Sequence, residues 1–98
     1  MHGIEIPQDR IATFCRANGI RRLALFGSIL RDDFQSDSDV DVLVEFEPGI
    51  CVGLAFITMQ DQLSAILGRP VDLNTPGSLS QYFRDRILRE AQALYVAA

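Results

Sequence analysis

A Gly-Ser pair and three aspartates are the residues of this chain whose types and spacing could do chemistry. Gly27-Ser28 follows a short apolar run, and Asp39-Val40-Asp41 comes ten residues later. A glycine at a strand-to-helix turn lets an anion approach the backbone with no Cβ in the way. Ser28 and the first free amides of a following helix offer hydrogen-bond donors to that anion. The pair therefore predicts a phosphate-binding turn.

The aspartates predict metal ligands. Residues two apart in a strand point to the same face, so Asp39 and Asp41 would face one way. Two carboxylates this close resist joint ionisation unless a cation lies between them. Asp72 lies inside the short apolar run Val71–Leu73 and can join them if that run pairs beside the strand containing Asp41. Carboxylates and substrate phosphates are the usual ligands of Mg²⁺, so the set predicts phosphoryl or nucleotidyl transfer with two metal ions.

Each part of this pattern also has a purely structural interpretation. A Gly-Ser pair is a common turn, and an Asp-x-Asp sequence on a strand is often only a solvated face. The order and spacing of the parts, together with Asp72, favour the metal site. Arg84, Arg86 and Arg89 are interpreted as a hydrated helix face, with an acidic partner surface as the alternative.

Hydrophobic periodicity predicts the elements that must position these residues. In chain order we expect a helix from Pro7 to a stop at Asn18-Gly19, a strand 23–26, a short helix 29–34, a strand 40–46, a helix 54–67, a strand 71–73 and a last helix capped by Ser80. This order predicts an α/β (α+β) fold with a small mixed sheet of three or four strands and helices packed against it. The whole chain, residues 1–98, is expected to be one domain.

The apolar pattern also predicts which side chains are buried. The last helix would bury one stripe made of Phe83, Ile87, Ala91 and Leu94. Cys15 and Cys51 lie among apolar residues and are predicted to be buried free thiols, and Tyr82 and Tyr95 to be partly buried.

Composition excludes several classes of function. The 98 residues include nine basic residues, all arginine, against thirteen acidic ones, which gives a net charge of −4. The absence of lysine excludes Schiff-base chemistry and a P-loop lysine, and His2 as the only histidine excludes a histidine triad or a multi-histidine zinc site. The acidic balance argues against extended nucleic-acid binding. With no signal-like start and no apolar run long enough to span a membrane, a cytoplasmic protein without membrane contact is expected.

Two stretches, LFGSILRDDFQSDSDVDVLVEF and VDLNTPGSLSQYFRDRILREAQALYV, resemble the minimal nucleotidyltransferase (MNT) family of the polymerase-beta-like nucleotidyltransferase superfamily. The resemblance covers nearly the whole chain, from about Ile20 to Val96. It implies the nucleotidyltransferase fold and activity. Members of this family commonly pair with a HEPN-domain toxin, and some of these antitoxins transfer AMP from ATP to a tyrosine of the toxin.

The resemblance also implies a role for each residue of the pattern. Gly27 and Ser28 would hold the β- and γ-phosphates of a nucleoside triphosphate. Asp39 and Asp41 would ligate both Mg²⁺ ions. Asp72 would complete the second metal site and help orient or deprotonate the attacking hydroxyl.

The expected function is therefore Mg²⁺-dependent transfer of AMP from ATP to a protein hydroxyl, by an antitoxin in a hetero-oligomer with a HEPN-domain toxin. Arg31, in the predicted short helix, is a further candidate phosphate contact. The alternative is a non-catalytic antitoxin that neutralises its partner by binding alone. Transfer to a small molecule such as an aminoglycoside is a third possibility, but such enzymes generally have a further substrate-binding domain, so the chain length favours a protein acceptor.

Overall fold

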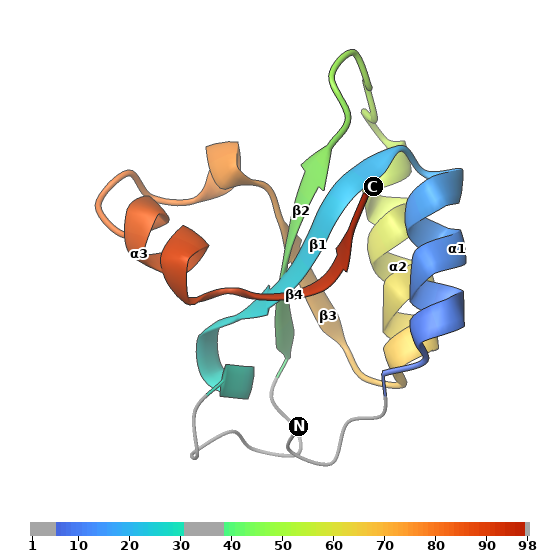
Figure 1. Cartoon of the computed structure of the whole chain (residues 1–98), viewed down its shortest axis with the longest axis horizontal. Helices are drawn as coiled ribbons and strands as arrows, with labels where there is room; N and C mark the ends of the chain where they lie inside the picture. The colour runs from blue at the N-terminus through green and yellow to red at the C-terminus, as the bar shows by residue number, and fades with distance from the viewer. Residues whose placement is uncertain (1–5, 31–38, 98) are drawn as a thin grey trace.

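The computed structural model describes residues 6–30 and 39–97 of the chain. Its elements in chain order are α1 (Gln8–Ala17), β1 (Ile20–Phe26), the 3-10 helix η1 (Gly27–Leu30), β2 (Val40–Phe46), α2 (Ala55–Leu67), β3 (Val71–Asn74), the 3-10 helix η2 (Pro76–Ser78), α3 (Arg84–Glu90) and β4 (Gln92–Val96). The strands form one sheet in the order β3-β2-β1-β4 (Figure 1). The β2–β3 pair is parallel and the other two pairs are antiparallel, so the predicted α/β class with a small mixed sheet is confirmed.

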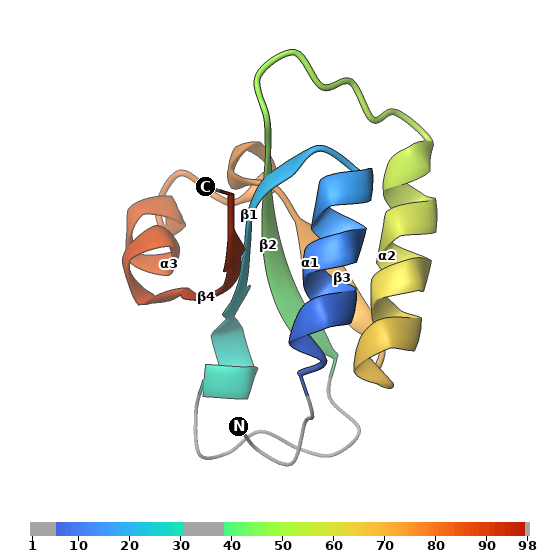
Figure 2. The ribbon, with the colours of Figure 1, turned by 45° about the vertical axis from the view of Figure 1, so that its right-hand side comes forward.

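The two faces of the sheet are covered differently. Helices α1 and α2 pack side by side on one face, and α3 lies on the opposite face (Figure 2). The alternation along β2 divides its side chains between these faces, because Val40, Val42 and Val44 belong to the core beneath α1 and α2. Asp41, which lies between the first two, therefore faces the α3 side. That core also includes Ile11, Phe14, Cys15, Leu23, Leu25, Met59, Leu63 and Leu67.

The edge strand β3 is held in place by side chains of α2. The backbone N–H of Leu73 donates to Gln60 Oε1 at 2.9 Å, and that of Val71 donates to Ser64 Oγ at 3.1 Å. An edge strand otherwise presents unpaired backbone groups. Helix α2 thus contributes side chains to the core and also fixes β3, the strand that carries Asp72.

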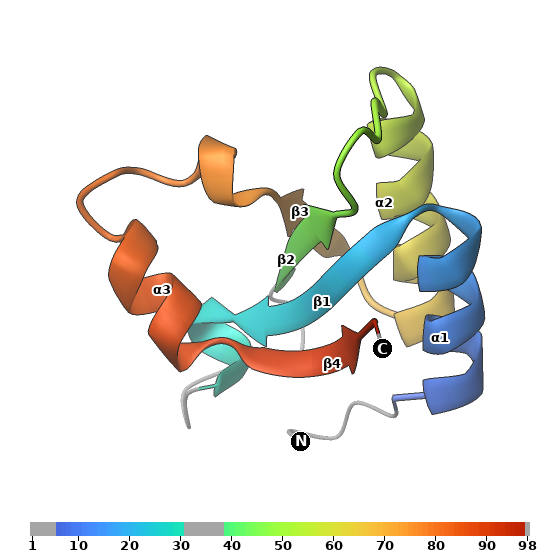
Figure 3. The same cartoon turned by 45° about the horizontal axis from the view of Figure 1, so that its top comes forward.

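The end of the chain differs from the sequence prediction. The last helix is only the seven residues Arg84–Glu90, and the backbone becomes extended at Ala91. Leu94 therefore lies in β4, which pairs with β1 beside Leu23–Leu25 (Figure 3). A helical stripe and a short alternating strand both fit this apolar spacing, and pairing with the open edge of β1 selects the strand.

Smaller differences concern element bounds. The predicted strand 40–46 is confirmed, while β1 begins at Ile20, three residues earlier than predicted. The described part of the predicted helix 29–34 is the 3-10 turn Gly27–Leu30, and residues 31–34 lie outside the described residues. Within the described ranges, no helix has the length and apolar character needed to cross a membrane.

Three side chains predicted to be wholly or partly buried are exposed. Cys51 is exposed in the loop between β2 and α2, where the neighbouring Ile50 is exposed as well and only Val52 packs against the core. Tyr82 is 85% exposed and Phe83 is 52% exposed; both directly precede α3, a helix that itself has no buried residue. Cys15, by contrast, is fully buried as predicted.

The two thiols are predicted to differ sharply in reactivity. Burial raises the pKa of Cys15 to about 12, against a smaller opposing effect of Arg16, so this thiol carries almost no reactive thiolate near neutral pH. Titration of the native protein with a thiol-reactive disulfide at about pH 8 is expected to label Cys51 alone. C51S should then abolish native labelling while C15S preserves it, and unfolding should expose the second thiol. Equal labelling rates at both cysteines in the folded protein would contradict the buried position of Cys15.

Candidate functional site

The turn that follows β1 is shaped by a contact between Gly27 and Asp41. Gly27 has φ +77°, a left-handed conformation in which a side chain is strained. A Cβ built on Gly27 would overlap Oδ2 of Asp41. The carboxylate thus occupies the space that any larger residue would take. The turn therefore requires glycine for its backbone conformation and also for the approach of Asp41.

Asp41 and Asp72 are neighbours on adjacent parallel strands. They are direct register partners in the β2–β3 pair, so their side chains project from the same face of the sheet. Neighbouring strands lie about 4.8 Å apart, which places two carboxylates within reach of one cation. Asp41 is half-buried and Asp72 is exposed, and both face the α3 side of the sheet. The structure thus has the β2–β3 pairing on which the sequence analysis made the role of Asp72 depend.

The third aspartate lies directly before β2. Asp39 is exposed and two residues from Asp41. Across residues 6–30 and 39–97, no group of three or more His, Cys, Asp or Glu side chains is close enough to hold a metal ion by itself. The Asp41–Asp72 pair has the hard oxygen donors that Mg²⁺ prefers, and Mg²⁺ usually takes one or two protein carboxylates with substrate phosphates as further ligands. The residues present thus fit a cation that binds together with a phosphate.

The phosphate-binding residues predicted from the sequence lie at the end of β1. Ser28 follows Gly27 in η1 and is half-buried, so the Gly-Ser turn adjoins Asp41 as expected. Phe26, the last residue of β1, is the register partner of Asp41. Arg31 lies outside the described residues. Phe26, Asp41 and Asp72 are consequently register partners across β1, β2 and β3, and Gly27 directly follows the first of them.

Sequence reasoning missed the two residues that hold β3. Gln60 and Ser64 are four apart on α2, so they lie on one side of that helix, next to the edge strand. Their only signal in the sequence is that both polar residues adjoin the apolar stripe of Met59, Leu63 and Leu67; in the structure they are half-buried. By accepting hydrogen bonds from the backbone on either side of Asp72, they fix the position of this residue on β3.

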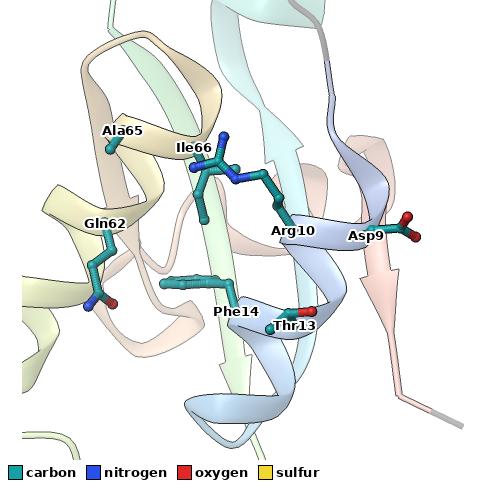
Figure 4. A pocket seen from close by; sticks show the side chains of 7 residues that line it. All are labelled: Asp9, Arg10, Thr13, Phe14, Gln62, Ala65 and Ile66. Carbon is teal, nitrogen blue, oxygen red and sulfur yellow. The ribbon is translucent and has the colours of Figure 1, made fainter.

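A surface cavity lies away from these aspartates. A cavity of about 530 Å³ lies between α1 and α2, with Phe14 and Ile66 in it and Arg10 at its edge (Figure 4). It is on the helix-covered side of the sheet, whereas Asp41 faces α3. We therefore place the candidate site at the Gly27 turn.

Comparisons with known proteins show which family and which solved structures this chain is similar to. The family model described as "Nucleotidyltransferase domain" matches residues 9–94. The protein adenylyltransferase MntA of Thermococcus cleftensis is 42% identical over 74 residues, which cover 74% of this chain and 72% of that protein.

Solved structures give the same fold. One, of a protein provisionally named a minimal nucleotidyltransferase, is 33% identical, with a TM-score of 0.70 over 86% of this chain and 85% of that one. A second is the MNT antitoxin complex with the tri-AMPylated HEPN toxin of Shewanella oneidensis, with 22% identity and a TM-score of 0.64 over 92% of this chain and 70% of that one. At that identity, the second likeness concerns the fold alone.

The Gly27–Asp41 contact makes a prediction about stability. Gly27→Ala is expected to lower the free energy of unfolding by more than Gly49→Ala, measured by urea denaturation. Both glycines have positive φ, +77° and +88°, so both variants carry backbone strain of about 1–3 kcal/mol. Only at Gly27 does the new Cβ also meet a neighbouring side chain, because nothing lies within 4 Å of a Cβ on Gly49. Equal losses in the two variants would show that Asp41 does not fill the space above Gly27.

Proposed function

The chain belongs to the nucleotidyltransferase domain family, and from that membership we propose that it transfers AMP from ATP to a hydroxyl group of a protein partner, as the antitoxin of a toxin–antitoxin pair. The observation that carries the proposal is that Gly27, directly after β1, lies against Asp41 of β2, whose register partner in β3 is Asp72. It sets a phosphate-accepting turn directly beside two register-paired carboxylates. This is the arrangement that transfer of a phosphate-linked group requires.

The residues would divide the work as follows. Gly27 leaves the backbone open to the β- and γ-phosphates, and the Ser28 hydroxyl donates to them. Asp41 and Asp72 would hold Mg²⁺ together with the triphosphate, and Asp39, two residues before Asp41, would join them only when both are bound. The ion would neutralise the triphosphate charge and favour ionisation of the attacking hydroxyl. Asp72, exposed at the edge strand, faces the side from which an acceptor arrives.

The reaction is an in-line displacement at the α-phosphorus. The acceptor oxygen forms a bond to that phosphorus while the bond to the bridging oxygen of the β-phosphate breaks, and pyrophosphate leaves with the electron pair. The hydroxyl proton passes to the Asp72 carboxylate and then to water. The chain needs no histidine base for this, because a carboxylate at the metal site serves.

We propose a HEPN-domain toxin as the acceptor. Support comes from the Shewanella oneidensis complex, in which the HEPN toxin is tri-AMPylated and bound to an MNT antitoxin of the same fold. The Thermococcus cleftensis relative is also named a protein adenylyltransferase. Transfer to such a partner predicts a hetero-oligomer in which the acceptor hydroxyl reaches the aspartate face of the sheet.

Substitution of the aspartates tests the chemistry. D39A, D41N and D72N are expected to lower Mg²⁺-dependent transfer of label from the α-phosphate of ATP to the partner by at least about 100-fold, since each removes a ligand whose charge stabilisation amounts to several kcal/mol. The assay combines this chain with the neighbouring gene's product and follows pyrophosphate release and the intact mass of both chains. One nucleotidyl unit of added mass on the partner would identify it as the acceptor.

The matched control is D61N, because Asp61 is an exposed aspartate on α2, on the other side of the sheet. It should transfer label at the wild-type rate. Full toxin neutralisation by D39A, D41N and D72N with no pyrophosphate release from any form of the protein would favour the alternative, an antitoxin that acts by binding alone.

A further inference from the structure

A second cavity opens on the aspartate face, between the Gly27 turn and α3. It has a volume of about 560 Å³ and is lined on one side by Phe26, Gly27 and Leu30. The opposite wall is formed by Phe83, directly before α3, and by Ile87 and other residues of α3. Figures 1 and 3 show α3 standing apart from the strands on this side. The cavity therefore adjoins the phosphate turn and lies across β1 from Asp41.

The lining of this cavity suits a flat aromatic ring better than a polyphosphate. Its walls are mainly apolar, and Phe83 leaves half of its surface exposed although it lines the cavity. The charged residues of the lining are Arg86 and Glu90, which cancel, so the cavity offers a tetra-anionic phosphate chain no net attraction. Apolar walls with a few polar groups at the edge are typical of small-molecule sites. A nucleobase has this combination of apolar faces and hydrogen-bonding edges.

We infer that this cavity binds the adenine base of the nucleotide, a proposal that rests on the function proposed above. Phe83 provides a face for stacking. The Glu90 carboxylate accepts a hydrogen bond from the exocyclic amine of adenine, and guanine would present a carbonyl oxygen there instead, which a carboxylate repels. Gln92, at the start of β4, adds an amide at the same edge. Glu90 thus selects ATP over GTP.

The position of the cavity agrees with the connectivity of a nucleotide. The ribose joins the base to the α-phosphate, so a base site must adjoin the phosphate site. Gly27 belongs to both, since it lines the cavity and contacts Asp41. On the far side of β1, Gln92 pairs with Leu25, next to the Phe26 that pairs with Asp41. One nucleotide can therefore occupy the turn and the cavity together.

Three probes separate the base from the phosphates: MgATP, MgGTP and magnesium tripolyphosphate, each titrated calorimetrically into the full chain. F83A is expected to weaken ATP binding about tenfold, the usual order for a lost stacking contact, and to leave tripolyphosphate binding unchanged. F83L, which keeps an apolar side chain, should give an intermediate loss. E90Q should reduce the preference for ATP over GTP by about tenfold, because its amide donates to the guanine carbonyl.

The controls are exposed neighbours that do not line the cavity. Y82A and D85N should bind all three probes as the wild type does. Unchanged ATP affinity in F83A and E90Q, or equal weakening of ATP and tripolyphosphate, would overturn the base site while leaving the proposed function intact. In F83A and E90Q, a raised KM for the protein acceptor at unchanged ATP affinity would also overturn the base site. It would show that the cavity binds a side chain of the acceptor instead. Failure of the wild type to bind either ATP or tripolyphosphate would overturn the proposed function as well.

Discussion

The approach of the Asp41 carboxylate to the backbone of Gly27 is the contact on which the site depends. It requires the end of β1 to turn with a positive φ directly opposite Asp41. The antiparallel register between β1 and β2 supplies that position, because Phe26 pairs with Asp41 and Gly27 follows at once. A slip of one residue would move every side chain of β2 to the other face. The apolar core and the site therefore depend on the same β1–β2 register.

The core and the site share strands without competing for them. Alternate residues of β2 serve α1 and α2 on one face, where the valines are fully buried. The residues between them serve the other face, where Asp41 meets its partner Asp72. Apolar burial under the two long helices thus stabilises the sheet, which lets the opposite face carry close like charges. Near the C-terminal end of β2, Glu45 forms ion pairs with Arg22 at 3.1 Å and Arg21 at 3.3 Å. Both pairs are partly exposed and contribute little to stability.

The sequence predicts the central part of this structure well, for a physical reason. The alternation in residues 40–46 and the apolar stripe of α2 fix both the strand and the face that it buries, and the apolar residues on either side of Asp72 predict the short strand that pairs beside Asp41. The chain end is different. Leu94 fits both a helical stripe and an alternating strand, and only the open edge of β1 decides between them. Phe83 is exposed because α3 does not reach the core, which no local pattern can indicate.

The central strands and α3 also differ in local stability. Asp41 lies in β2, inside the sheet, and the strand of Asp72 is held by two hydrogen bonds that its backbone N–H groups donate to side chains of α2. Helix α3 has seven residues and no buried one, too few to be stable alone, and it is anchored by β4 and by a 3.0 Å bond from Arg84 Nη2 to the Leu79 carbonyl. Local opening therefore costs less free energy at α3 than at the strands. The two carboxylates therefore lie on the more stable part of the fold, and the cavity wall formed by α3 lies on the less stable part.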